Sequence, residues 1–242
     1  MAKRGKRYEA AAKLVDPDRL YQPEEAAALV KQAAFANFDE TVEVHFKLGI
    51  DPRHADQQVR STATLPHGTG KTVRVVVFAE GEAARVARES GIPEENVGSD
   101  EMVARIEGGF LDFDISIAMA DQMGKVGKLG RILGRRGLMP NPRSGTVVRA
   151  VEDLPRVLDE VRGGRVEFRN DRTGLLHVPI GKKSFSEEQI ADNMLALVDA
   201  VNRAKPSGAK GVYVQSITLT TTMSPGVPLD VAGALGSATN RR

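Results

Sequence analysis

The segment from residue 72 to residue 162 restricts the fold of this chain more than any other part of its sequence. It begins with TVRVVVFAE, a nearly continuous run of β-branched and apolar residues, which is typical of a parallel strand covered on both faces. Strand patterns at 95–98 and 113–119 then alternate with helical patterns at 82–90, 101–109 and 151–162. Because parallel strands need such crossovers, the alternation predicts a three-layer, Rossmann-like α/β domain.

The two ends of the chain carry a different pattern. Residues 41–48 alternate strictly, with Val42, Val44, Phe46 and Leu48 on one side, as in a strand with one face in water. Further strands are predicted at 58–65, 165–171, 175–183 and 211–223, and helices at 7–15, 23–34 and from Ser186 to just before Pro206. Together these elements predict a discontinuous two-layer α+β domain, 1–69 and 164–242, into which the α/β domain, 70–163, is inserted.

Three local patterns make finer predictions. The sequence DRTG at 171–174 is a turn signal and predicts a hairpin of the two strands that flank it. In the last strand, Val212 and Val214 are out of phase with Ile217, which predicts a β-bulge near Gln215. The segment from Ser224 is rich in Gly, Pro, Ala and Ser, and we expect it to be loosely ordered.

The composition narrows the classes of function. The chain has a formal net charge of +2 and no cysteine, so thiol chemistry is excluded and a reducing compartment is expected. No run of about 18 apolar residues is present, so no membrane span is predicted. GTGKT at 68–72 resembles the end of a Walker loop, but Leu65 stands where that motif needs glycine. The four histidines lack metal-binding spacing, and we expect no metal, no cofactor and no enzymatic activity.

A basic segment, GKVGKLGRILGRRGLMPNPRSGTVVR at 124–149, contains no Asp or Glu. Its basic residues are Lys125, Lys128, Arg131, Arg135, Arg136, Arg143 and Arg149. Segregated positive charge is typical of a surface that binds a polyanion, and glycines let backbone N–H groups approach such a ligand. A solvated, mobile basic loop is the alternative interpretation.

A second candidate surface consists of hydroxyl groups. If Ile217 faces inward, then Ser216, Thr218, Thr220 and Thr222 share the opposite face of the last strand. Small hydroxyls suit contacts to riboses in the shallow minor groove of RNA. The alternative is that threonine is simply a favourable strand residue.

Five stretches, in this order and spacing, resemble a known family. They read FDETVEVHFKLGIDPR, VRSTATLPHGTGK, GRILGRRGLMPNPRSGTV, EFRNDRTGLLHVPIGK and NRAKPSGAKGVYVQSITLTTTM. The chain resembles the bacterial ribosomal protein L1 family, roughly from Lys6 to Met223. The resemblance implies a component of the large ribosomal subunit that binds 23S ribosomal RNA and forms the mobile stalk beside the E-site tRNA. It also implies a cytoplasmic, ribosome-bound protein that represses translation by binding the messenger RNA of its own operon.

The RNA-binding surface of that family lies on the discontinuous domain. Carried over by motif, it is expected at Phe38, Glu43, Asp171, Thr173, Ser216, Thr222 and Met223, and Arg169 joins it by its place beside the same turn. The carboxylates among these residues do not bind phosphate, but they accept hydrogen bonds from 2′-hydroxyl groups. The basic segment, with Lys125, Lys128, Arg131, Arg135, Arg136 and Arg143, then becomes a secondary RNA site.

Two positions depart from the family pattern. Ser224 follows TTTM where the family usually has Gly, and Arg135 replaces a Pro in LGRRGLMPNP. Serine would be unfavourable if the backbone at this turn required a positive φ. Arg135 adds charge and flexibility to the basic segment.

An RNA- or nucleotide-processing enzyme, with its active site between the domains, is the alternative function. Only the α/β pattern and GTGKT support it. Metal-dependent turnover of ATP, GTP or RNA would favour the enzyme.

Overall fold

The computed structural model describes residues 5–240, and within them the chain forms two compact units. One unit, the discontinuous unit, contains the residues up to Gly70 and those from Gly163 onward. The other, the α/β unit, is Lys71–Arg162. Each unit has hydrophobic core clusters of its own.

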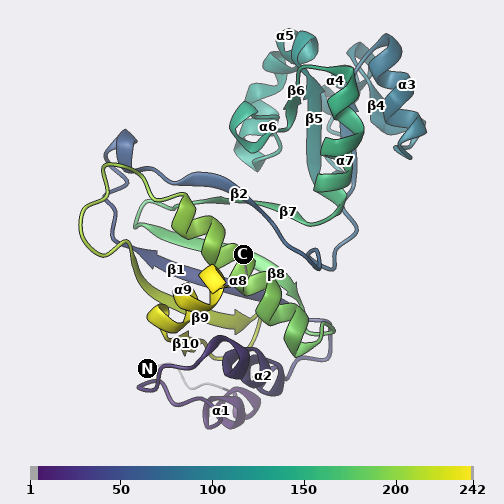
Figure 1. Ribbon diagram of the computed structural model, residues 1–242. Coiled ribbons are helices and arrows are strands. Elements are labelled where there is room, and N and C mark those ends of the chain that lie inside the picture. The colour runs from purple at the N-terminus through teal and green to yellow at the C-terminus, as the bar shows by residue number, and fades with distance from the viewer. Residues whose placement is uncertain (1–4, 241–242) are drawn as a thin grey trace. The chain divides into compact units, whose positions relative to one another are not determined.

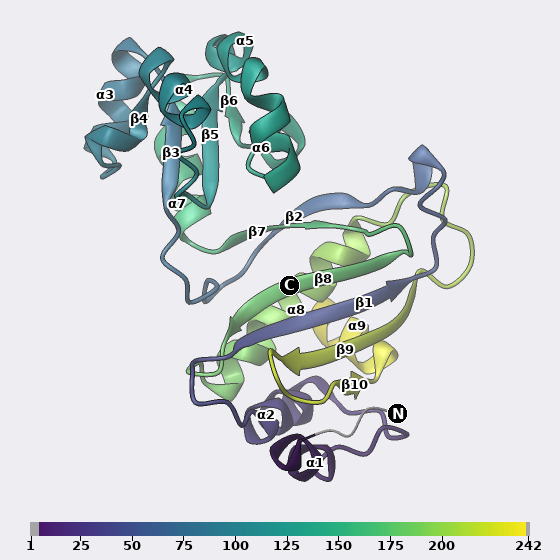
Figure 2. The same cartoon turned by 180° about the vertical axis from the view of Figure 1, so that it is seen from behind.

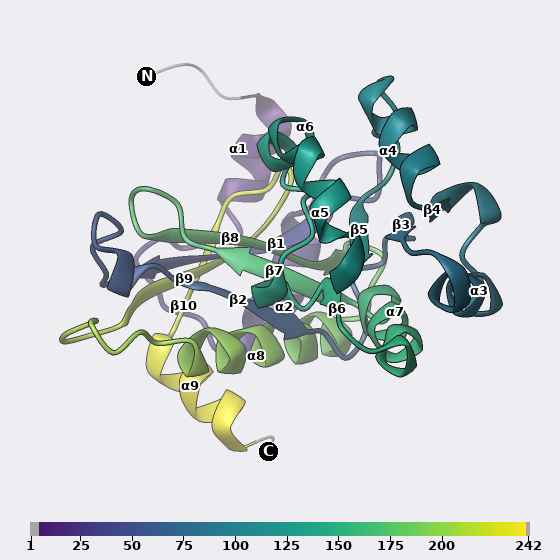
Figure 3. The ribbon, with the colours of Figure 1, turned by 90° about the horizontal axis from the view of Figure 1, so that it is seen from above.

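A four-stranded antiparallel sheet forms the centre of the discontinuous unit. Its order is β10-β9-β1-β8, with β1 at Thr41–Leu48, β8 at Leu175–Lys182, β9 at Val214–Thr221 and β10 at Val227–Leu229. Helices α8 (Glu187–Arg203) and α9 (Val231–Asn240) cover one face (Figures 1 and 3). Helix α2 (Pro23–Ala33) packs against α8, and α1 (Lys6–Ala12) against α2. Among the described residues of this unit, no helix lies over the opposite face of β1, β8 and β9 (Figure 2).

The predicted alternation of β1 is confirmed, because every second residue from Val42 to Leu48 is buried and packed into the core. The predicted bulge in β9 is confirmed as well. Lys47 lies opposite Ser216 whereas Leu48 lies opposite Val214, so Gln215 is an extra residue in β9. The bulge lets Val214 and Ile217 both face the core although three positions separate them.

The start of α8 follows its sequence signal. The Ser186 hydroxyl accepts from the N–H of Gln189 at 3.1 Å, and the Gln189 side chain accepts from the N–H of Ser186 at 2.9 Å. This reciprocal capping box fixes the first turn of the helix.

The hairpin predicted around DRTG is wrong in its strand pairing. β7 (Arg165–Arg169) pairs with β2 (Arg60–Thr64) in a separate two-stranded ribbon, whereas β8 pairs with β1. The turn itself is present, since the N–H of Asp171 donates to the carbonyl of Leu175 at 2.8 Å. The two strands therefore separate beyond this turn, and each pairs with a strand from the N-terminal part of the chain.

The expectation of a loose segment after Ser224 is also wrong. Val227 and Leu229 are buried in β10, and Ala234 and Ala238 of α9 are buried against the core. Asp230 caps α9 by accepting from the N–H groups of Ala232 and Gly233, both at 3.2 Å. Small residues here allow close packing of α9 on α8 and do not indicate disorder.

The α/β unit has the predicted three layers. Its parallel sheet has the order β4-β3-β5-β6, with β3 at Val75–Phe78, β4 at Val97–Gly98, β5 at Ile115–Met119 and β6 at Val147–Val148. Helices α3 (Gly81–Glu89) and α7 (Leu154–Arg162) share a core with one face. Helices α4 (Asp100–Glu107), α5 (Met123–Val126) and α6 (Gly130–Arg136) cover the other. Single 3-10 turns lie at Ala55–Gln57, Glu94–Asn96, Ala120–Gln122, Gly127–Leu129, Pro142–Ser144 and Val151–Asp153.

The chain leaves and re-enters the discontinuous unit at one place. The N–H of Leu65 donates to the carbonyl of Gly164 at 3.1 Å. A Cβ atom on Gly164 would lie 2.3 Å from the Cα of Gly68, and Gly164 has φ +101°. Only glycine fits this close approach. No helix within residues 5–240 is long and apolar enough to cross a membrane.

Candidate nucleic-acid interface

The helix-free side of β1, β8 and β9 carries three cross-strand rows of side chains, which we call the polar face. The rows are Thr220–Glu43–Pro179, Thr218–His45–His177 and Ser216–Lys47–Leu175. Each β1 member of a row is partly exposed, and the residues between them face the core. The alternation of β1 therefore builds the core and the polar face from the same eight residues.

One end of the polar face is organised by Glu40, a residue that sequence analysis did not single out. Its side chain is fully buried. One carboxylate oxygen accepts from the N–H of Ala36 at 2.8 Å, and the other accepts from the Thr221 hydroxyl at 2.7 Å and the N–H of Met223 at 3.0 Å. Glu40 thus joins the loop before β1 to the turn after β9.

The electrostatics of Glu40 fit this role. Burial alone would raise its pKa, but the hydrogen bonds from Thr221, Ala36 and Met223, together with the charge of Lys183, lower the pKa below its ordinary value. Glu40 is therefore ionised at neutral pH although it is buried, because three donors replace its water.

Three predicted site residues lie around the Glu40 anchor. Phe38 and Met223 are large apolar side chains that are 54% and 48% exposed. The N–H of Thr222 donates to the carbonyl of Thr41 at 3.1 Å, and the Thr222 hydroxyl oxygen accepts from the N–H of Thr41 at 3.1 Å. The hydroxyl hydrogen of Thr222 remains available to an acceptor outside the protein.

The other end of the polar face is the turn that contains Asp171 and Thr173. Asp171 accepts from the N–H groups of Leu175 and Thr173, both at 2.8 Å, and from the Thr173 hydroxyl at 2.7 Å. These bonds, led by that from Leu175, lower the pKa of Asp171. The Lys47 ammonium donates to the carbonyl of Thr173 at 2.8 Å, which joins this turn to β1 next to Ser216.

A hollow of about 540 Å³ borders the same turn. Its lining includes the arginines Arg53, Arg169 and Arg172 beside Asp171. All three arginines are exposed. Arg53 comes from the loop after β1, and it could not be predicted from the sequence because Arg169 and Arg172 are more than a hundred residues away in the chain.

The departure at Ser224 is accommodated. No non-glycine residue in the described part of the chain has a positive φ, so this turn does not require glycine. The Ser224 hydroxyl accepts from the N–H of Thr221 at 2.9 Å and donates to the carbonyl of Pro225 at 3.1 Å.

The basic segment is folded. Lys125 is not free of acidic partners: its ammonium lies 2.7 Å from Glu80 and 2.9 Å from Asp100. These carboxylates come from other elements, which the local sequence could not reveal. The exposed basic residues of the segment are Lys128, Arg131, Arg135, Arg136, Arg143 and Arg149.

The glycines of the basic segment also differ from expectation. Most lie in helical turns between Met123 and Arg136, where backbone N–H groups bond within the helix rather than to a ligand. Gly137 ends α6 in the left-handed conformation with φ +70°. Arg135 lies in the last turn of this helix, where proline would be unfavourable.

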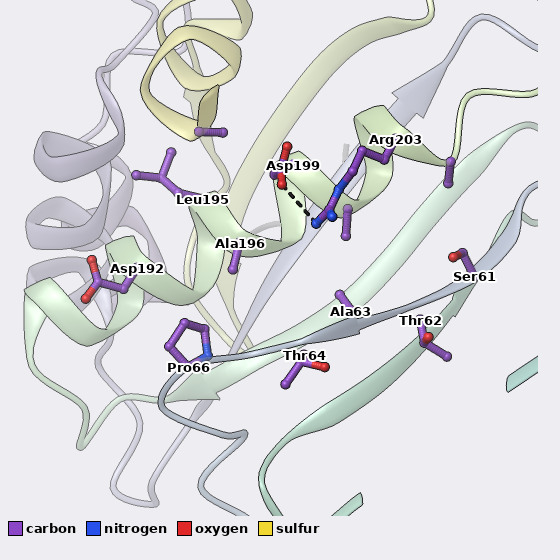
Figure 4. Close-up of a pocket in the computed structure, with 13 residues that line it drawn as sticks. Ser61, Thr62, Ala63, Thr64, Pro66, Asp192, Leu195, Ala196, Asp199 and Arg203 are labelled. Atoms are coloured by element: carbon purple, nitrogen blue, oxygen red, sulfur yellow. Dashed lines mark ion pairs between the residues drawn. The ribbon is translucent and has the colours of Figure 1, made fainter. Parts of the chain in front are cut away.

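A larger groove of about 690 Å³ lies between β2 and α8 (Figure 4). Its acidic side chains already have partners: Asp199 pairs with Arg203 at 2.9 Å and Asp192 with His67 at 3.0 Å. Small residues such as Ala196 and Ala200 form much of the remaining lining. No group of three His, Asp or Glu among residues 5–240 is arranged to hold a metal ion.

Comparison with known proteins identifies the family. The model of the "Ribosomal protein L1p/L10e family" matches residues 30–225. The chain is 62% identical over 238 residues to the large ribosomal subunit protein uL1 of Thermomicrobium roseum, covering 98% of each chain. It is 60% identical over 235 residues to uL1 of Chloroflexus aurantiacus, covering 97% of this chain and 98% of the relative.

These relatives are named as ribosomal proteins and not as enzymes. The enzymatic alternative, which rested on the α/β pattern and GTGKT, is therefore set aside. In the structure Thr72 is followed by β3 after two further residues rather than by a helix. The chain belongs to the ribosomal protein L1p/L10e family.

Proposed function

We propose that this protein is a constituent of the large ribosomal subunit and binds 23S ribosomal RNA through the polar face. The observation that carries the proposal is the gathering of the candidate residues on one unit, at both ends of a sheet face that no described helix of that unit covers. The names of the relatives support assignment to the large subunit.

The two ends of the polar face would make different contacts. Phe38 and Met223 offer exposed apolar surface for bases or sugars, and the Thr222 hydroxyl offers a hydrogen bond. At the other end, Ser216 and Thr173 offer hydroxyls, and Arg53, Arg169 and Arg172 offer positive charge for phosphates. Asp171 acts mainly by holding Thr173, because its oxygens already accept hydrogen bonds within the turn.

The α/β unit would act as a secondary, electrostatic partner of RNA. The exposed basic residues of its basic segment form a basic surface that suits contact with phosphates, and Arg131, Arg135 and Arg136 of this surface lie on α6. We assign the two compact units to two domains with these separate roles. In the ribosome, this arrangement fits a mobile stalk that contacts tRNA in the E site and assists its release.

The same polar face would serve a regulatory role. An RNA fold in the messenger of its own operon that resembled the ribosomal site would compete for the same residues, and the free protein would then repress translation. This role, like the ribosomal one, places the protein in the cytoplasm. It requires no cofactor.

Binding to 23S RNA at several salt concentrations tests the proposal. We expect the intact protein to bind a 23S transcript in preference to a 16S transcript. Replacing Arg131, Arg135 and Arg136 by Gln should make the slope of log affinity against log salt shallower, by about 0.7–0.9 for each phosphate that the variant does not neutralise. Preference for the 23S transcript should survive in this variant.

The control variant replaces Arg7, Arg85 and Arg88 by Gln, which removes the same charge from other exposed positions. Its salt slope should stay close to that of the wild type. Equal binding of 23S and 16S transcripts by the wild type would contradict the proposed function. Loss of the preference in the α6 variant would show that the basic surface, and not the polar face, reads the RNA.

A further inference from the structure

Two histidines meet at the centre of the polar face. His45 of β1 lies opposite His177 of β8, their Nδ1 atoms are 2.8 Å apart, and their ring centroids are 4.9 Å apart. At this distance one Nδ1–H donates to the other Nδ1. In the neutral pair, the donating ring therefore has an unprotonated Nε2, and the accepting ring has an Nε2–H.

Few charged groups face this pair. On β1, the Glu43 carboxylate lies 3.9 Å from Nε2 of His45, and Lys47 is held by the carbonyl of Thr173. Asp171, in the turn before β8, interacts electrostatically with His177. From β9, the neighbour of His45 is the uncharged Thr218. Burial lowers the pKa of His45, and His177 lowers it further, whereas Glu43 opposes these effects.

The position of the pair matters because the proposed RNA contacts lie on both sides of it. Thr222 lies beside Thr41 at the start of β1, and Ser216 lies opposite Lys47 near its end. These positions are about 20 Å apart at the usual rise of a strand. An RNA that contacts both ends must pass over His45 and His177.

Glu43 would repel the phosphates of such an RNA. A proton on the Nε2 atom that is unprotonated in the neutral pair would offset this charge and convert an acceptor into a donor. After one proton is taken up, both rings present an Nε2–H outward, while the Nδ1–H···Nδ1 bond between them is kept. Two N–H donors and one positive charge suit a phosphate or a base acceptor.

We propose that the His45–His177 pair is a further RNA contact and takes up one proton when RNA binds. This inference rests on the proposed function of the polar face. Because the complex holds more protons than the free protein, RNA affinity should rise as pH falls toward the pKa of the free pair, and it should level off below that pKa. One proton limits the change to tenfold for each pH unit.

Affinity for the 23S transcript at fixed salt, measured at about pH 8 and about pH 5.5, tests the inference, since unperturbed histidines titrate within this range. We expect the wild type to bind about tenfold more tightly at the lower pH. His45→Gln should remove most of this dependence, and His177→Gln provides a second, independent variant. His67→Gln is the control, because His67 pairs with Asp192 of α8 and should leave the dependence unchanged.

The outcomes separate the two proposals. If the wild type prefers 23S RNA but both His45→Gln and His177→Gln keep its full pH dependence, the histidine contact is wrong and the polar face stands. If the wild type shows no preference for 23S RNA at either pH, the proposed function itself fails. An NMR titration that shows no rise in the pKa of either histidine upon RNA binding would also overturn the inference.

Discussion

Replacing Glu40 by Gln is expected to destabilise the discontinuous unit by about 2–4 kcal/mol, because buried donors left without an acceptor cost about 1–3 kcal/mol each. The two oxygens of Glu40 accept from the hydroxyl of Thr221 and from the N–H groups of Ala36 and Met223. An amide can offer only one acceptor oxygen, so its NH₂ group would face at least one of these donors. The free energy of unfolding at neutral pH, from denaturant titration, measures the loss.

The stabilisation by Glu40 should also depend on pH. The pKa of Glu40 is lowered from its ordinary value of 4.5 in the folded protein. Its contribution to stability is therefore complete above that ordinary value and is lost as pH falls through the lower pKa of the folded state. The difference between the wild type and Glu40→Gln should shrink in acid.

Glu9→Gln is a matched control, since Glu9 is exposed and its replacement should change stability by less than about 0.5 kcal/mol. Equal stability of Glu40→Gln and Glu9→Gln at neutral pH would show that the buried carboxylate does not anchor this end of the polar face.

Replacing Thr222 by Val should weaken binding to 23S RNA about 5- to 150-fold. This range corresponds to about 1–3 kcal/mol for an RNA group buried without its partner. Valine keeps the β-branch and nearly the volume of threonine but removes the hydroxyl. The N–H of Thr41, which donates to that hydroxyl, lies at an exposed position, so water can replace the bond and stability should change little.

Two further variants control this prediction. Thr222→Ser keeps the hydroxyl and should retain most of the affinity. Thr64→Val changes an exposed strand threonine of β2, away from the polar face, and should bind as the wild type does. Should Thr222→Val bind 23S RNA as tightly as Thr64→Val, the hydroxyl contact at the end of β9 would be wrong.

Local patterns were sufficient to predict much of the fold. The alternation from Val42 to Leu48 located β1, and the phase change between Val214 and Ile217 located the bulge. Both features follow from which residues must face the core, so they are visible in a short stretch of sequence. The β-branched run at β3 and the helices around it indicated the parallel sheet for the same reason.

Other features depend on residues that are far apart in the chain. Glu40 could not be identified because its partners Thr221 and Met223 are about 180 residues away. The partners of Lys125 could not be identified either, because Glu80 and Asp100 lie on other elements. The segment after Ser224 was misjudged by its composition, although Asp230 and the spacing of Ala234 and Ala238 were signals of a capped, packed helix.

The chain leaves the discontinuous unit and returns to it through two neighbouring segments, and this makes a direct test of the polar face possible. Gly68 and Gly164 are in contact, so a short linker between residues 69 and 164 can replace the α/β unit without stretching the remaining chain. The shortened protein contains the core of the discontinuous unit and every residue of the polar face.

The decisive measurement is the affinity of this shortened, folded protein for 23S and 16S transcripts at one salt concentration. Binding through the polar face predicts that it retains most of the affinity of the intact protein for 23S RNA and the same preference over 16S RNA. A folded, shortened protein that binds both transcripts equally weakly would contradict the assignment of RNA recognition to the polar face.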